Sequence, residues 1–144
     1  MPDVNKFTDI VKNYVGTPFK QHARTPGAGL DCVGVLACAV HEMGWTHYKD
    51  VKGYSIRPAD SLLSKTLISY GVLIVPKSEI KPGDILEFFY ESTPQHVGVA
   101  VEENGVLCVV HAYMQRKKVI IHRIDEGLKV NISRVYRLPE LVNG

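Results

Sequence analysis

The 144-residue sequence lacks most features that would assign it to a specialised class of protein. It has only three cysteines, whereas a small disulfide-framed domain has an even and denser set. Its 17 basic and 15 acidic residues leave a net charge of +2, which provides no strong attraction for nucleic acid or an anionic membrane. The composition is therefore that of an ordinary globular domain, with 45% hydrophobic residues.

Long apolar runs are also missing. The longest stretch without Asp, Glu, Lys or Arg, 104–115, has 12 residues. This is well short of the roughly 20 that a membrane-spanning helix requires. The N-terminus has no basic segment followed by an apolar one, so no signal peptide is predicted. We expect a chain that is cytoplasmic when made and has no membrane partner.

Three helices are predicted in the N-terminal half. The first, over 3–14, has apolar side chains at steps of three and four residues. The second, over 31–43, is more apolar and ends at Gly44, and the third covers 58–70. The Gly- and Pro-rich segment 19–30 is expected to be a loop. The second helix is expected to cross the centre of the domain.

After residue 72 the pattern changes to short strands separated by turn signals. Asn104-Gly105 is the strongest of these signals, because this dipeptide favours a two-residue hairpin turn. Helices followed by consecutive strands indicate one α+β domain over 1–144, with a meandering antiparallel sheet of about five strands against the second helix. The predicted strands are Asp84–Tyr90, Gln95–Glu102, Gly105–Tyr113, Lys118–Ile124 and Ser133–Leu138.

Of the three cysteines, Cys32 has the setting of a nucleophile. It comes at the start of the second predicted helix, where backbone N–H groups and the helix dipole favour a thiolate and can stabilise an oxyanion. A packed core residue would fit the same position, so position alone leaves both interpretations open. Cys38 and Cys108 have apolar neighbours and are expected to be buried and inert.

Two histidines are predicted to lie beside each other near this cysteine. With a turn at Asn104-Gly105, antiparallel pairing brings His96 opposite roughly residues 111–113, and so next to His111. His96 would then be the base for Cys32, with His111 fixing its tautomer. The alternatives are a histidine pair that serves only packing and a zinc site with Cys32, His96 and His111 as ligands. The ligand spacing is unlike that of a zinc site, so no metal is expected.

The remaining histidines are less well placed for catalysis. His22 lies in the loop before Cys32 and is the only one of them expected to line a cleft. His41 and His47 flank the end of the second helix, and His122 lies within a predicted strand.

Together these residues resemble the NlpC-type cell-wall peptidases, which are papain-like cysteine peptidases, and especially the phage tail-associated versions. The resemblance spans roughly residues 7–112. Phe19 stands where the family usually has Tyr. The matching segments are Gly16-Thr17-Pro18-Phe19, Asp31-Cys32-Val33-Gly34-Val35, Lys81-Pro82-Gly83-Asp84-Ile85, His96-Val97-Gly98-Val99 and His111-Ala112.

The resemblance implies a papain-like fold and a cysteine endopeptidase or amidase that hydrolyses the peptide stem of peptidoglycan without a cofactor. Cys32 would be the nucleophile, His96 the general base and His111 the orienting residue. Asp31, Phe19 and His22 are the implied substrate-binding residues, although Asp31 is equally suited to cap the helix. Phage-tail or secretion-apparatus proteins would be partners, and a virion tail or the cell wall the destination.

Two alternatives remain open at this stage. A papain-like acyltransferase, or a hydrolase of another substrate, would use the same thioester chemistry. A tail-assembly or binding module would keep the scaffold without catalysis. The cleaved bond, the host and the oligomeric state do not follow from the sequence.

Overall fold

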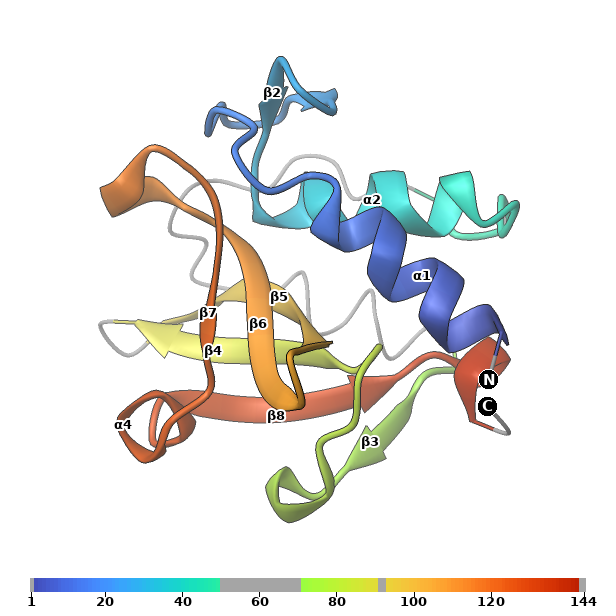
Figure 1. Cartoon of the computed structure of the whole chain (residues 1–144), viewed down its shortest axis with the longest axis vertical. Helices are drawn as coiled ribbons and strands as arrows, with labels where there is room; N and C mark the ends of the chain where they lie inside the picture. The colour runs from blue at the N-terminus through green and yellow to red at the C-terminus, as the bar shows by residue number, and fades with distance from the viewer. Residues whose placement is uncertain (1, 50–70, 91–92, 143–144) are drawn as a thin grey trace.

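Two helices lie side by side against one face of a curved antiparallel sheet in the computed structural model, which describes residues 2–49, 71–90 and 93–142 (Figure 1). The first helix, α1, covers Pro2–Lys12, and the second, α2, covers Cys32–Glu42. Both contact strand β5, Thr93–Glu103. The first two of the three predicted helices are confirmed. The third, expected over 58–70, lies outside the described residues.

Among the described residues, the main sheet has six strands in the order β3-β8-β4-β5-β6-β7, one strand more than predicted. Consecutive hairpins connect β4 through β7, as the turn signals indicate. The bounds of the other strands are β3 Leu73–Val75, β4 Ile85–Tyr90, β6 Val106–Tyr113, β7 Lys118–Arg123 and β8 Ile132–Arg137.

The last strand departs from the predicted meander. β8 pairs with β4 instead of continuing beside β7, and β3 pairs with β8 at the edge of the sheet. This position lets Ile132 and Val135 pack with Leu86 and Phe88 in one apolar cluster. The partner of β8 is thus chosen by side-chain burial, which the local turn signals do not encode.

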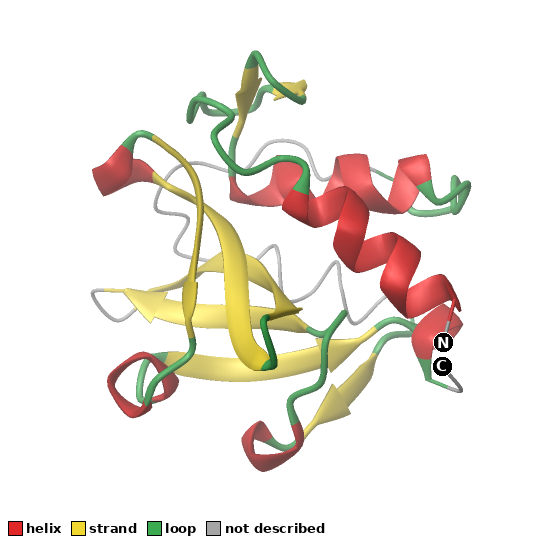
Figure 2. Ribbon diagram, in the orientation of Figure 1, coloured by secondary structure: helices red, strands yellow, loops and turns green. Residues whose placement is uncertain are grey.

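Short elements occupy some of the predicted connections (Figure 2). Within the expected loop 19–30, β1 and β2 pair as a small hairpin. The segment between the strands predicted at Lys118–Ile124 and Ser133–Leu138 contains the helix α4, with Asp125 as its N-cap. The bounds are β1 Arg24–Thr25, β2 Gly29–Leu30, α4 Glu126–Lys129, η1 Lys77–Glu79, η2 Met114–Arg116 and η3 Pro139–Leu141.

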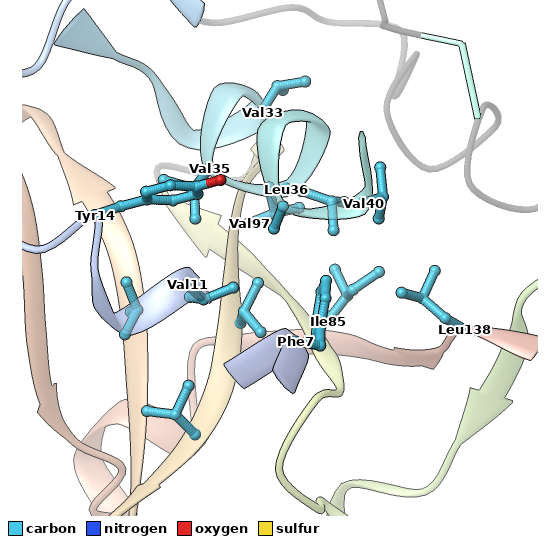
Figure 3. Close-up of a cluster of buried hydrophobic side chains, with 14 of the residues drawn as sticks. Phe7, Val11, Tyr14, Val33, Val35, Leu36, Val40, Ile85, Val97 and Leu138 are labelled. Atoms are coloured by element: carbon cyan, nitrogen blue, oxygen red, sulfur yellow. The ribbon is translucent and has the colours of Figure 1, made fainter. Parts of the chain in front are cut away.

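The sheet separates two apolar cores. In the first, helix residues such as Phe7 and Leu36 pack with Val97 and its strand neighbours (Figure 3). The second core lies on the other face and includes Phe88 and Val109. Alternation along each strand therefore decides which core a side chain enters. Within the described ranges, no helix has the length and apolar character needed to cross a membrane.

Candidate functional site

Asp31 sets the start of helix α2. Its extended backbone and its side chain make it the N-cap, because Oδ1 accepts a hydrogen bond of 2.8 Å from the backbone N–H of Gly34. The cap leaves Cys32 as the first helical residue. The predicted capping role of Asp31 is confirmed.

The preceding loop is tied to the same carboxylate. Asp31 Oδ2 accepts from the backbone N–H of His22 at 2.7 Å, and Oδ1 accepts from Arg24 Nη1 at 2.9 Å. Asp31 is only 2% exposed, so these donors compensate a buried negative charge. Gly34 permits the close approach, since a Cβ there would lie 2.7 Å from the carbonyl oxygen of Ala23.

The sulfur of Cys32 lies where helix α2 meets strand β5. The backbone N–H groups of Val97, Val33 and Cys32 itself act on it as hydrogen-bond donors and lower its pKa. Burial and the charge of Asp31 have the opposite and larger effect, and together they raise the pKa of Cys32 to about 11. The resting group is therefore a neutral thiol, which corrects the sequence-based expectation that the helix start favours a thiolate.

His96 and His111 are neighbours, as the hairpin register predicts. The pairing of Val99 with Val110 continues to Glu103 opposite Val106, across the turn at Asn104-Gly105. His96 Nε2 lies 2.5 Å from His111 Nδ1, and the ring centroids are 4.7 Å apart. His96 also directly precedes Val97, whose N–H contacts the Cys32 sulfur. The strand thus connects the cysteine to the histidine pair.

A glycine makes room for the second histidine. A Cβ on Gly98 would lie 2.6 Å from Val109 Cγ2 and 3.0 Å from His111 Cβ, which is closer than packed atoms tolerate. Gly98 therefore has a structural reason to be glycine even though its backbone needs no positive φ. His111 fits against it and is only 1% exposed.

A third histidine, His122, joins the pair from strand β7. Its Nε2 lies 2.8 Å from His111 Nε2, and the two ring planes differ by 16°. The sequence pattern alone did not predict this contact. The signal was the register of the β6–β7 hairpin, which pairs Val109 with His122 and so places it diagonally from His111.

Burial keeps all three histidines neutral. It lowers the pKa of His96 to about 3, with a smaller contribution from His122. It also lowers the pKa of His111 strongly, with His96 and His122 adding to the effect. Burial lowers the pKa of His122 as well, and the charge of Arg116 acts in the same direction while Asp125 opposes it. The candidate site therefore combines neutral imidazoles with a neutral thiol at pH 7.

The other singled-out residues have varied surroundings. His22 is exposed and has a positive φ of 65°, and Phe19 is partly buried against the first core. Their roles toward a substrate, like that of Asp31, stay predictions. Cys108 is buried, as expected, whereas Cys38 is only partly buried and donates to the carbonyl of Arg24 at 3.3 Å. All three cysteines are thiols outside any disulfide.

Across residues 2–49, 71–90 and 93–142, no group of three or more His, Cys, Asp or Glu side chains has an arrangement that would hold a metal ion. The three histidines instead turn their ring nitrogens toward one another.

Solved structures identify the fold, whereas no protein-family model and no curated protein sequence matches the chain. The NlpC/p60 domain of the peptidoglycan hydrolase SagA matches with a TM-score of 0.63 at 18% identity, over 94% of this chain and 98% of that one. NlpC2 from Trichomonas vaginalis matches with a TM-score of 0.66 at 20% identity, over 94% of this chain but only 46% of that one.

A third match is an N-acetylmuramoyl-L-alanine amidase from Bacteroides uniformis. Its TM-score is 0.61 at 14% identity, over 95% of this chain and 99% of that one. At these identities the likeness concerns the fold. The chain has the fold of the NlpC/p60 domain, which confirms the papain-like α+β fold expected from the sequence resemblance.

Proposed function

We propose that the chain is a cysteine peptidase or amidase that hydrolyses an amide bond in the peptide stem of bacterial peptidoglycan. The observation that carries the proposal is the position of Cys32 at the first turn of α2, against the backbone N–H of Val97, whose preceding residue, His96, contacts His111. The substrate class is supported by the solved neighbours, one described as a peptidoglycan hydrolase and another as an N-acetylmuramoyl-L-alanine amidase.

The proposed reaction begins with proton transfer. His96 Nε2 is occupied by His111, so Nδ1 is the nitrogen that takes the proton from the Cys32 thiol as the sulfur attacks the carbonyl carbon. A resting neutral thiol fits this order, because the proton moves during attack instead of beforehand. The oxyanion forms at the N-terminus of α2, where backbone N–H groups and the helix dipole stabilise negative charge.

The intermediate then resolves in two steps. The C–N bond breaks as His96 returns the proton to the leaving amine, and a thioester remains on Cys32. His96 next takes a proton from water, whose oxygen attacks the thioester carbonyl. The C–S bond breaks, the acid product leaves, and the sulfur recovers the proton. An acyltransferase would follow the same path with another acceptor in place of water.

Digestion of defined muropeptides with mass readout tests this function. The wild-type chain is expected to release a fragment with a new amine, with one water added across one stem amide. Cys32→Ala should abolish the release. Cys38→Ala is the matched control, because Cys38 lies in the same helix and should leave the activity intact. Equal activity in the Cys32→Ala protein would refute the proposal.

Delivery by a phage tail or similar apparatus is a further part of the proposal. It is supported by the sequence resemblance to phage tail-associated versions of the family. Detection of the chain in purified virions would support it. Its absence from virions that assemble normally in a producing host would contradict it.

A further inference from the structure

Three histidine rings form a continuous hydrogen-bonded row across strands β5, β6 and β7. His96 Nε2 contacts His111 Nδ1 at 2.5 Å, and His111 Nε2 contacts His122 Nε2 at 2.8 Å. The ring of Phe88, a member of the second core, contacts both His96 and His111. His111 therefore has both ring nitrogens committed to other histidines.

The row has only two self-consistent directions while the rings are neutral. A neutral imidazole carries one N–H donor and one acceptor nitrogen, so the two hydrogen bonds of His111 must point the same way along the row. In one direction His96 donates to His111 and His111 donates to His122. In the other, His122 donates to His111 and His111 donates to His96.

Only one of these directions leaves His96 able to act as a base. When His96 donates from Nε2, its Nδ1 carries a lone pair for the Cys32 proton. When His96 accepts at Nε2, its proton sits on Nδ1 and no lone pair remains for the thiol. The acceptor state of His122 Nε2 thus decides whether the distant ring of His96 is competent.

We infer that His122 is a positioning residue that accepts a hydrogen bond from His111, fixes the Nε2–H tautomer of His111 and so keeps Nδ1 of His96 available as the base. The catalytic consequence of this inference rests on the proposed function. The tautomer of His111 can be measured without any substrate. His111 is only 1% exposed, so water would be a poor substitute for His122 as the hydrogen-bond acceptor.

Titratable or charged groups face His122 from three parts of the fold. His111 faces it from β6, Arg116 acts on it from η2, and Asp125 acts on it from the residue before α4. Protonated His122 has no acceptor nitrogen and would have to donate to His111. Charging His122 therefore reverses the row, and acid should inactivate the enzyme through this group.

Two substitutions at position 122 separate positioning from packing. His122→Leu removes the acceptor, and His122→Gln keeps one in its amide oxygen. We expect His122→Leu to lower kcat about tenfold with little change in KM, as loss of an outer hydrogen-bond partner of a functional histidine does. His122→Gln should restore most of kcat and should lose the acid inactivation that follows charging of His122. His47→Gln, on the exposed side chain of His47, is the surface control.

Nitrogen-15 NMR of the histidine rings measures the tautomer directly. In the wild-type and His122→Gln proteins, the His111 proton should lie on Nε2, and in His122→Leu the resonances should shift toward the Nδ1–H form. An unchanged His111 tautomer in His122→Leu, or unchanged kcat with an altered tautomer, would overturn the inference. A tautomer that depends on position 122 in a protein that cleaves no muropeptide would uphold the hydrogen-bond role and refute the proposed function instead.

Discussion

The two halves of the candidate site differ in how they are built. Cys32 owes its place to residues immediately beside it, because Asp31 caps the helix and binds the loop that precedes it. The histidines come from three strands and meet only through the register of two hairpins. We call the Asp31–Cys32 segment the local half of the site and the three histidines the tertiary half. Different substitutions should disturb each half.

The largest expected effect is on the local half. Asp31→Ala removes the helix cap and the buried carboxylate that the half-buried Arg24 side chain contacts. We expect a loss of about 3 kcal/mol in the free energy of unfolding, measured by urea denaturation.

The matched control for Asp31→Ala is Asp125→Ala. Asp125 caps the short helix α4 in the same way, accepting from the backbone N–H of Leu128 at 2.8 Å, but it is exposed. Its loss should reduce stability by about 1 kcal/mol or less. Equal losses at the two positions would mean that the partners of buried Asp31 add nothing beyond a cap.

The next largest effect is on the tertiary half. Gly98→Ala places a Cβ against Val109 and His111, and we expect it to lower stability by about 2 kcal/mol through overpacking. The histidine ring signals in the NMR spectrum should shift with it.

Gly127→Ala provides the comparison for Gly98→Ala. A Cβ there meets only Asp125 Oδ1 at 3.5 Å, within helix α4, so stability should be unchanged or slightly higher. If Gly98→Ala were as well tolerated as Gly127→Ala, the tight seat of His111 would not be a constraint on the fold.

Acid should weaken the tertiary half selectively. The pKa of His96 falls from 6.5 to about 3 on folding, and those of His111 and His122 are lowered too. Below pH 6.5 the unfolded chain therefore binds protons that the folded chain does not. The stability that the neutral histidines confer is complete above this pH and is lost as pH falls, by up to about 1.4 kcal/mol per pH unit for His96. His111 and His122 act in the same direction.

Urea denaturation at a series of pH values between 7 and 5 measures this slope. His111→Asn removes one of the three groups and should flatten the curve. A wild-type stability that does not fall between these pH values would contradict the neutral assignment of the histidines.

The last prediction, with the smallest expected effect, concerns the reactivity of the Cys32 thiol. With the pKa of Cys32 raised to about 11, its alkylation by iodoacetamide in the substrate-free protein should be slow at pH 7 and increase about tenfold per pH unit above it. A protein with Cys38→Ala and Cys108→Ala reports Cys32 without interference. A rate plateau between pH 5 and 7 would indicate a thiolate–imidazolium pair in place of the neutral one.

Several elements could be predicted from the sequence because the patterns that indicate them are local. The helix expected over 31–43 is observed at Cys32–Glu42, and the Asn104-Gly105 turn sets the β5–β6 register that brings His96 to His111. The pairing of β8 with β4 was not accessible, since it depends on burial against distant side chains. His122 was not predicted because the connection 114–117 between β6 and β7 has no dipeptide turn signal like Asn104-Gly105 to set the register that brings it to His111.

By itself, the sequence determined helices α1 and α2, the hairpin strands, the capped start of α2 and the choice of Cys32, His96 and His111 as candidates. These depend on periodicity, capping and turn chemistry, which act over a few residues. Only the tertiary structure decided the protonation of the thiol and the addition of His122 to the row. Both depend on desolvation and cross-strand contacts, which exist only when distant segments pack together.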